Sequence, residues 1–563
     1  MAKILTLHDP RTARSYYESG SWQNDTLYGL LVKHATERAS AYALRDGRRR
    51  LTWREWLEAV DCVAADLHRQ GLCAGDRVSI WLPNQIEAAI VLLACARNGY
   101  VCNPSLHQNY TVAEILSLLE NIRSRALFTQ SGYGADGGQA DVFVRAREIP
   151  AMRCIYSVSS ARSDSVPQGA LPFPTGKAQD PPPPPETDPD KITYLAFTSG
   201  TTGVPKGVMH SDNTLLANAR AMVEDWKHDS TTTLLSLSPL SHHIATVGLM
   251  QTLVAGCEFV ISQLSPATPA IDWIERSEAT YVMGVPTHAI DVLAAAKQRS
   301  LTRLHRVSVF YMAGAPIPTE VARQLMDLGA TPQNIYGMTE NGSHHYTLPT
   351  DDLETITATC GRGCRSYEIR LWSQDNRDVE VGAGEVGEIG GRGATLMLGY
   401  YSDQLMTEDS FNASGWFMSG DLGQEDDRGN LRVVGRKKDL IIRGGHNIHP
   451  ARIEELAHRH PEVSRAAAFG VADERLGEKV CLAVIPVTGR SPTPQALLSH
   501  LNEVGLSKFD MPEYFVSLPA FPLTASGKVL KRELLAWVQS KKIQPIPVRW
   551  TALTQDSANA YRA

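Results

Sequence analysis

The sequence predicts an α/β protein with largely parallel sheets, because helical and strand patterns alternate along much of the chain. The first patterns are an amphipathic helix, a buried strand, a second helix and a second strand, at residues 51–70, 77–82, 85–98 and 125–128. Strands and helices alternate again from residue 192 to about residue 323. Such alternation is typical of βαβ units, so we expect a large N-terminal domain of mainly parallel sheets flanked by helices.

A different pattern begins after Cys360. Residues 368–372 and 385–391 read as alternating strands, which indicates a distorted β-barrel or a small antiparallel lobe. The five prolines of residues 181–185 form a stiff polyproline segment without core-forming side chains. We expect this segment to be an exposed connector between two lobes, with an SH3-type ligand as the alternative.

Composition favours a soluble cytoplasmic protein. The net charge is −6 over 563 residues and the basic side chains are scattered, so nothing indicates a nucleic-acid partner. Asp9, Pro10 and Arg11 lie where a signal peptide needs an apolar core. The longest apolar stretches are too short or too interrupted to span a bilayer, so we expect no membrane insertion.

The cysteines and paired histidines do not form a convincing metal site. The nine cysteines are dispersed, which fits free thiols in a reducing compartment. Cys360 and Cys364 form a close pair but have no second Cys or His pair nearby, so buried thiols are favoured over zinc. The doublets at residues 242–243 and 344–345 are poor chelators, because adjacent strand residues point to opposite faces.

The most informative segment is residues 194–208, where an apolar run breaks into hydroxyls, glycines and one lysine. It predicts a buried strand that leads into a phosphate-binding loop. Glycines let backbone N–H groups approach anionic oxygens, hydroxyls add donors and the lysine adds a cation. The residues that supply these groups are Thr198, Ser199, Gly200, Thr201, Thr202, Gly203 and Lys206.

A triphosphate suits this loop, but the loop differs from a P-loop. A P-loop requires a hydroxyl residue directly after its lysine, and here Gly207 follows Lys206. A solvated Ser/Thr/Gly linker is the plainer alternative, which the apolar residues on both sides of the loop disfavour.

Further stretches carry a resemblance to a known family. In chain order, these stretches are Pro239-Leu-Ser-His, Ala313-Gly-Ala-Pro-Ile-Pro, Tyr336-Gly-Met-Thr-Glu, Trp416-Phe-Met-Ser-Gly-Asp-Leu, Gly435-Arg-Lys-Lys-Asp and Pro522-Leu-Thr-Ala-Ser-Gly-Lys. Together with the phosphate loop, this ordered series resembles the adenylate-forming superfamily of acyl-CoA synthetases, peptide-synthetase adenylation domains and luciferases. Within this superfamily, the sequence as a whole most resembles medium-chain and cyclohexanecarboxylate–CoA ligases.

The resemblance implies two domains. In this family a small, mobile α+β C-terminal domain begins near the position of Asp439. We therefore expect an N-terminal domain at residues 1–438, which binds ATP and the acid, and a C-terminal domain at residues 439–563, which carries a catalytic lysine.

The resemblance also implies roles for single residues in adenylation. Lys528 would bridge the carboxylate, the α-phosphate and the ribose, Thr339 would contact the α-phosphate, and Glu340 would bind the Mg²⁺ ion carried by ATP. Adenine would stack on Tyr336 and lie along the loop of residues 313–316. The remaining nucleotide contacts would come from Gly314, Ala315, Pro316, Gly337, Asp421 and Arg436.

For the second half-reaction the resemblance implies coenzyme A as acceptor. His242 would separate the acid pocket from the thiol tunnel, and Gly445 would leave room for pantetheine. We therefore expect an AMP-forming acyl-CoA synthetase that acts on a cyclic, aromatic or medium-chain acid. The alternatives are a stand-alone enzyme that loads a carrier protein, a luciferase-like oxygenase and a non-catalytic carboxylate-binding or scaffold protein.

The acid pocket and the protein partners are the least defined expectations. The resemblance places the pocket around Trp226 and at residues 242–247, 285–287, 313–315 and 341–342. Two expectations concern protein partners. The first is a homodimer. The second is a lysine acetyltransferase that acts on Lys528, because Pro522 and Gly527 match the acetylation pattern of acyl-CoA synthetases.

Overall fold

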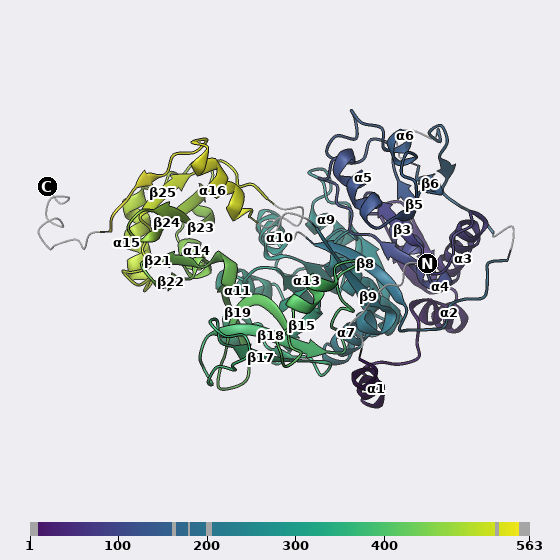
Figure 1. Ribbon diagram of the computed structural model, residues 1–563, viewed down its shortest axis with the longest axis horizontal. Helices are drawn as coiled ribbons and strands as arrows, with labels where there is room; N and C mark the ends of the chain where they lie inside the picture. The colour runs from purple at the N-terminus through teal and green to yellow at the C-terminus, as the bar shows by residue number, and fades with distance from the viewer. Residues whose placement is uncertain (1–8, 160–164, 178–180, 199–204, 524–528, 551–563) are drawn as a thin grey trace, which may run out of the picture. The chain divides into compact units, whose positions relative to one another are not determined.

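The computed structural model describes residues 9–159, 165–177, 181–198, 205–523 and 529–550 (Figure 1). The chain divides into two compact units. The first comprises Met1–Arg370, Gly390–Phe417 and Glu425–Arg432. The second comprises Leu371–Ile389, Met418–Gln424 and Val433–Ala563.

The first unit contains two large sheets. The nine-stranded sheet has the order β16 (Arg362–Gly363), β15 (Gly342–Tyr346), β14 (Thr331–Met338), β13 (Val309–Ala313), β12 (Tyr281–Gly284), β10 (Thr233–Ser236), β11 (Glu258–Ile261), β1 (Tyr42–Arg45) and β2 (Arg50–Thr52). The seven-stranded sheet has the order β7 (Leu171–Pro172), β6 (Cys154–Ser157), β5 (Ser124–Thr129), β3 (Arg77–Trp81), β4 (Val101–Asn103), β8 (Ile192–Thr198) and β9 (Lys206–Ser211).

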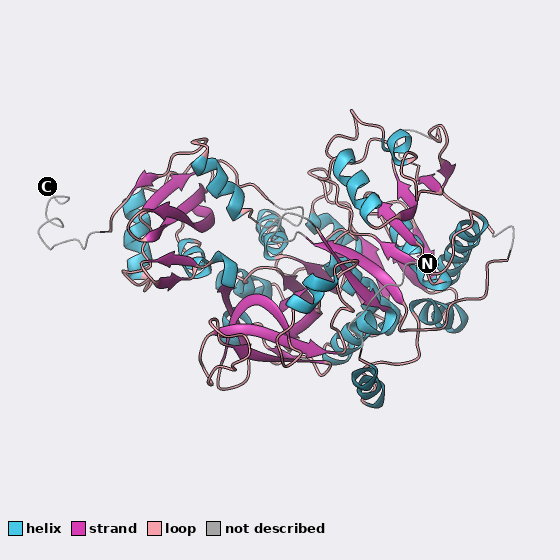
Figure 2. Ribbon diagram, in the orientation of Figure 1, coloured by secondary structure: helices cyan, strands magenta, loops and turns pink. Residues whose placement is uncertain are grey.

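Most neighbouring strands in both sheets are parallel, and the antiparallel pairs lie at the edges: β1–β2, β14–β15 and β15–β16 in one sheet and β8–β9 in the other. Between them run the helices (Figure 2), which are α1 (Pro10–Glu18), α2 (Leu27–Glu37), α3 (Trp53–Arg69), α4 (Ile86–Asn98), α5 (Val112–Asn121), α6 (Val142–Ala146), α7 (Asp212–Asp225), α8 (His243–Ala255), α9 (Ala270–Ser277), α10 (Pro286–Gln298), α11 (Thr319–Asp327), α12 (Leu353–Ala358) and α13 (Gln404–Asp409). The predicted α/β class of mainly parallel sheets with flanking helices is confirmed.

The expected elements of the first 130 residues are α3, β3, α4 and β5. Helix α3 begins at a capping box, in which the Thr52 side chain accepts from the Glu55 backbone N–H and the Glu55 carboxylate accepts from the Thr52 backbone N–H. Helix α4 is buried along its whole length, which agrees with its predominantly apolar sequence.

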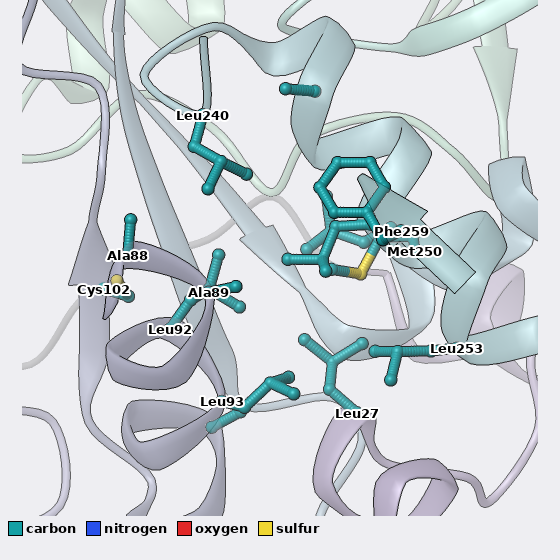
Figure 3. Close-up of a cluster of buried hydrophobic side chains, with 14 of the residues drawn as sticks. Leu27, Ala88, Ala89, Leu92, Leu93, Cys102, Leu240, Met250, Leu253 and Phe259 are labelled. Atoms are coloured by element: carbon teal, nitrogen blue, oxygen red, sulfur yellow. The ribbon is translucent and has the colours of Figure 1, made fainter. Parts of the chain in front are cut away.

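The core of the first unit joins helices that belong to both sheets. Side chains from α2, α4, α8, β4 and β11 meet in one apolar cluster (Figure 3), which includes Leu27, Leu93, Cys102, Leu253 and Phe259. All five side chains have an exposed fraction of 2% or less. This shared core fixes the two sheets against each other within the unit.

The polyproline segment differs from its expected place as a connector between lobes. It joins β7 to β8, which belong to the same seven-stranded sheet. The backbone carbonyl of Pro183 accepts a hydrogen bond from Arg97, whose guanidinium also contacts Asp61. The segment is therefore held against the last turn of α4.

Helix α1 was not predicted from the sequence. Asp9 caps it by accepting from the backbone N–H groups of Arg11 and Thr12, and Pro10 occupies its first position. The segment after the helix is anchored by Trp22, whose indole N–H donates to the carbonyl of Ala394.

A four-stranded sheet takes the place of the expected small β lobe, with the order β17 (Tyr367–Trp372), β18 (Gly387–Gly393), β19 (Phe417–Glu425) and β20 (Leu431–Arg436). The single-turn 3-10 helix Lys437–Asp439 follows β20.

A six-stranded sheet within the second unit is made of β22 (His446–Ile448), β21 (Ile441–Arg443), β24 (Gly477–Pro486), β25 (Tyr514–Ser517) and β26 (Ile546–Pro547) in that order, with β23 (Val463–Asp473) also paired to β24. The helices of this part of the chain are α14 (Pro450–Ala457), α15 (Pro494–Glu503) and α16 (Lys531–Gln539).

Candidate functional site

The predicted residues of the first unit gather at the carboxyl edge of its nine-stranded sheet. Strands β10, β12, β13 and β14 are parallel neighbours, so their carboxyl ends lie side by side. The segments that follow them contain His242, Val285, Gly314 and Thr339. Open parallel sheets bind ligands at this edge, which makes it the natural place for a substrate.

The two strands on either side of the predicted phosphate loop, β8 and β9, form an antiparallel pair. Thr198 closes β8 and is the cross-strand partner of Lys206, which opens β9. The five loop residues Ser199, Gly200, Thr201, Thr202 and Gly203 lie outside the described residues, as does Lys528.

Lys206 and Glu340 meet at a tyrosine that the sequence analysis did not identify. The Lys206 ammonium lies 5.0 Å from the centroid of the Tyr400 ring, a cation–π distance. The Tyr400 hydroxyl donates to a Glu340 carboxylate oxygen at 3.0 Å. Burial, and then the Glu340 charge, raise the pKa of Tyr400, so the phenol stays protonated and is a donor.

Thr339 and Tyr336 lie on the β14–β15 hairpin of the same edge. The Thr339 carbonyl accepts a hydrogen bond from Nε2 of His210 at 2.7 Å. The Tyr336 ring packs edge-on against His344, with centroids 5.2 Å apart.

Gly337, on the same hairpin, admits no side chain. A Cβ there would lie 1.8 Å from the carbonyl oxygen of Gly342, so the hairpin requires glycine at this position.

The structure places His242 among two further histidines. It occupies the position before the first residue of α8 without a side-chain capping hydrogen bond, and its ring lies 4.6 Å from that of His107. Burial, and then the charge on His242, lower the pKa of His107 to about 3 and that of His288 to about 4. Both neighbours are therefore neutral near pH 7.

The two residues expected to contact the ribose form an ion pair. Nε of Arg436, at the end of β20, lies 2.9 Å from Oδ1 of Asp421 on β19. The Asp421 side chain is 8% exposed and the Arg436 side chain is 41% exposed. A buried carboxylate that is paired with a guanidinium can accept hydrogen bonds from two hydroxyls, while the guanidinium fixes its orientation.

Gly445 lies in the two-residue turn between β21 and β22. Arg443 pairs with His446 across the turn, and φ is +58° at Gly444 and +85° at Gly445. Two positive φ angles are typical of a type I′ hairpin turn, which favours glycine for conformational reasons alone. A Cβ at Gly445 would meet nothing within 4 Å, so the glycine faces open space.

The remaining loop residues are at the surface. Gly314, Ala315 and Pro316 are exposed directly after β13, and Gly314 has a φ of +89°. An exposed loop at the carboxyl end of a parallel strand is available to a ligand.

The sequence analysis missed Tyr400, His107, His210 and His288. Tyr400 follows Gly399 in the short motif Leu-Gly-Tyr-Tyr, and this tyrosine after a glycine was an available signal. His107 lies in the segment after β4, His210 on β9 and His288 in the first turn of α10, and no local pattern marks them as neighbours of His242 or Thr339.

The described part of the chain contains no group of three or more His, Cys, Asp or Glu side chains arranged to hold a metal ion. All nine cysteines are free, as expected. The expectation that neighbouring histidines point apart is wrong for His344 and His345, because their Nδ1 atoms lie 2.7 Å from each other. Among the described helices, none is long and apolar enough to cross a membrane.

Comparison with known proteins gives relatives along nearly the whole chain. The 2-hydroxy-7-methoxy-5-methyl-1-naphthoate–CoA ligase of Streptomyces carzinostaticus is 31% identical over 536 residues, which cover 93% of this chain and 95% of that protein. The medium-chain fatty-acid–CoA ligase of Escherichia coli is 26% identical over 541 residues, with 94% and 93% covered. The ATP-bound crystal structure of MatB from Rhodopseudomonas palustris superposes with a TM-score of 0.81 at 25% identity, covering 92% of this chain and 99% of that chain.

These findings define the class of protein as an adenylate-forming acid–thiol ligase. Residues 31–401 match the family described as AMP-binding enzyme, and residues 452–528 match the AMP-binding enzyme C-terminal domain. The chain belongs to the AMP-binding enzyme family.

Proposed function

We propose that this chain is an AMP-forming acyl-CoA synthetase. A carboxylate oxygen of the acid attacks the α-phosphorus of ATP, the bond to pyrophosphate breaks, and an acyl adenylate forms. The thiol sulfur of coenzyme A then attacks the acyl carbon and releases AMP. The observation that carries the first step is the cluster in which Lys206 lies over the Tyr400 ring and Tyr400 donates to Glu340.

This cluster suits the departure of pyrophosphate. Lys206 supplies a positive charge beside the predicted phosphate loop, where negative charge grows as the bond to pyrophosphate breaks. Tyr400 fixes the Glu340 carboxylate, so this group is pre-oriented before ATP binds.

Glu340 fits the Mg²⁺ ion that accompanies ATP. It offers a hard oxygen ligand, and Mg²⁺ is commonly held by one or two carboxylates together with substrate phosphates. When bound, Mg²⁺ would neutralise phosphate charge.

Asp421 and Arg436 complete the proposed nucleotide contacts at the ribose, and Thr339 and Lys528 at the α-phosphate. In the second step Gly445 would leave room for the pantetheine arm, and residues 439–563 would act as a separate C-terminal domain. Relatives named as CoA ligases support coenzyme A as the acceptor. The position of Gly445 on an exposed hairpin is compatible with a passing thiol chain.

An acceptor experiment tests the proposal. The purified protein is given ATP, Mg²⁺ and a panel of carboxylic acids, with pyrophosphate release and acyl-CoA formation followed separately. We expect pyrophosphate release with at least one aromatic, cyclic or medium-chain acid, and conversion to its CoA ester when coenzyme A is added. Adenylate that accumulates with coenzyme A present, but transfers to a phosphopantetheinylated carrier protein, would overturn the choice of acceptor. Absence of pyrophosphate release with every acid would overturn the proposal as a whole.

A further inference from the structure

A surface pocket of the first unit lies outside the sites proposed above. It contains about 710 Å³ of space, part of which is open to solvent. Its lining comes from α2 and the segment before it, from α7, from the last turn of α8 and from the residues after β16. None of the described lining residues is among those expected to contact ATP, the acid or coenzyme A. The space is sufficient for a small molecule.

Part of the pocket wall is apolar. It is formed by Leu30 on α2, Val223 on α7 and Val254 on α8. Leu30 is buried in the main core of the unit, and Val254 packs against that core. The wall therefore offers the hydrocarbon part of a ligand a fixed apolar surface.

The charged side chains described in the lining carry one more positive than negative charge. Arg220 pairs with Asp25, and Nη1 of Arg365 lies 2.5 Å from Oε2 of Glu224, so these four charges balance. Lys33 is exposed on α2, has no ion pair within the described chain and supplies the additional positive charge. The lining as a whole therefore suits a ligand with a single negative charge.

Arg220 is the deeply buried charge of this pocket. Its side chain is 9% exposed, whereas that of its partner Asp25 is 48% exposed. Burial lowers the pKa of Arg220 and the neighbouring Arg365 acts in the same direction, although Asp25 opposes both. The net lowering of the pKa indicates that one half-exposed carboxylate does not fully offset the cost of burying this guanidinium.

The hydrogen bonds of Arg220 leave donors for a ligand. In the described structure, Nη1 donates to the carbonyl of Ser21 at 3.5 Å and Nη2 donates to Oδ2 of Asp25 at 3.3 Å. Both distances are longer than is usual for an N–H···O hydrogen bond. A guanidinium has five N–H groups in a planar fork, and a carboxylate suits this fork because it accepts two parallel hydrogen bonds.

A carboxylate fits the pocket better than a phosphate monoester does. A phosphate monoester carries a charge of about −1.5 to −2 near pH 7, which exceeds the positive charge left in the lining. Asp25 and Glu224 line the same space and would repel the additional negative charge.

We propose that this pocket is a second ligand site, which binds a small organic carboxylate through Arg220 and holds its apolar group against Leu30, Val223 and Val254. Binding here requires neither ATP nor coenzyme A. The inference is therefore independent of the proposed function, and the two can fail separately.

The test reports binding from a fluorine label at the pocket. Gln23→Cys replaces an exposed lining residue by a thiol for a trifluoromethyl reagent, and the exposed native Cys73, which does not line the pocket, carries the same label as an internal reference. The full-length protein is titrated with phenylacetate without ATP and followed by fluorine NMR. We expect a saturable shift of the label at position 23 and a constant resonance from the label on Cys73.

Three further probes separate the parts of the ligand. Phenylacetamide lacks the charge, acetate lacks the apolar group, and benzyl phosphate carries the larger charge. Each should bind at least about tenfold more weakly than phenylacetate. Absence of a saturable shift with phenylacetate, equal shifts of both labels, or equal binding of phenylacetamide or acetate would overturn the proposal. Equal binding of benzyl phosphate would overturn the choice of a carboxylate.

Two variants, made together with Gln23→Cys, assign the binding to the arginines. Arg220→Gln removes the buried guanidinium and should weaken phenylacetate binding about 10- to 100-fold. Arg365→Gln removes a cation from the exposed rim and should weaken binding about threefold, and it remains informative if loss of Arg220 unfolds the unit.

Arg306→Gln is the matched control for both variants. Arg306 is exposed and pairs with Glu278, and neither residue lines the pocket, so phenylacetate should bind to this variant as it does to the wild type. Thermal unfolding of each variant shows whether the fold is kept. Unchanged binding in a folded Arg220→Gln protein, or in Arg365→Gln if the former does not fold, would overturn the proposal.

Discussion

The first unit holds several histidines in its interior, whereas the histidines of the second unit are exposed or partly buried. In the first unit, burial lowers the pKa to about 3 at His107, His243 and His345, and to about 4 at His210 and His228. Among the histidines of the second unit, burial also lowers the pKa of His449 and His460, while the neighbouring carboxylates Asp510 and Glu462 act in the opposite direction. An interior polar group is fixed by its partners and sensitive to their loss.

The proposed sites follow the same contrast. Lys206, Tyr400 and Glu340 are positioned by contacts between side chains, whereas Gly444 and Gly445 matter through the backbone of an exposed turn. Substitutions in the cluster should therefore remove chemistry without unfolding the chain. Substitutions in the turn should act through steric obstruction and through backbone conformation.

The largest expected effect is at Glu340. Glu340→Gln keeps the shape of the side chain but removes its charge, so adenylation should fall about 10²- to 10³-fold, the usual loss for one transition-state contact. ATP–pyrophosphate exchange measures this loss. Glu320→Gln, on the exposed surface of α11, is the matched control and should retain activity. Near wild-type exchange in Glu340→Gln would break the assignment of this carboxylate to the nucleotide.

The next effect should be confined to the second half-reaction. Gly445→Leu places a branched side chain in the open space at the turn, so acyl-CoA formation should fall about 100-fold while exchange is nearly kept. The measurements are exchange, ester formation and thermal unfolding on one preparation.

The matched control for Gly445→Leu separates obstruction from backbone strain. Gly489 also has a positive φ, +77°, and a Cβ there would meet nothing within 4 Å. Gly489→Leu should therefore cost the same backbone strain, about 1–2 kcal/mol, without a loss of ester formation. Parallel losses of exchange, ester formation and stability in Gly445→Leu would show that the turn is only structural.

A smaller effect is expected at Tyr400. Tyr400→Phe keeps the ring beside Lys206 but removes the donor to Glu340, so adenylation should fall about tenfold, which corresponds to one hydrogen bond of about 1.4 kcal/mol. The apparent affinity for Mg²⁺ in the exchange assay should weaken together with the rate. A loss as large as that of Glu340→Gln would mean that the hydroxyl has a direct role in the reaction.

The smallest effect concerns acid stability. His228 has a pKa of about 4 in the folded chain and about 6.5 when unfolded, so the unfolded state binds more protons between these values. Stability is therefore fully present above about pH 6.5 and decreases as the pH falls towards 4, by up to about 1.4 kcal/mol per pH unit. His228→Phe should weaken the fall in melting temperature between pH 7 and pH 5, whereas replacement of the exposed His458 by Phe should not. An unchanged pH dependence in both variants would contradict the buried, neutral state of His228.

Local elements of the fold could be predicted from the sequence because their signals are local. Helix α3 has an apolar stripe and a capping box, and strand β3 is a short apolar run between polar segments. Glycine- and hydroxyl-rich loops could likewise be recognised as ligand sites. The order of the strands in the sheets could not be predicted, because it depends on packing between segments that are distant in the sequence.

Several parts of the candidate site depend on such distant contacts. The Tyr400 hydroxyl meets Glu340 from 60 positions away, and His210 reaches Thr339 across 129 positions. Nothing in the sequence near Tyr400 or His210 specifies the partner, because the register of β9, β14 and the segment at residue 400 sets both contacts. The pattern supplied the residue types at the site, and tertiary packing decided which of them meet.

The contact between Trp22 and Ala394 has a consequence for the order of events during synthesis. The two residues are 372 positions apart, so the ribosome needs about 20 to 75 s to reach the second one after making the first. During that interval α1 and the indole of Trp22 have no final docking place. The amino end of the chain therefore joins the folded structure late, although it leaves the ribosome first.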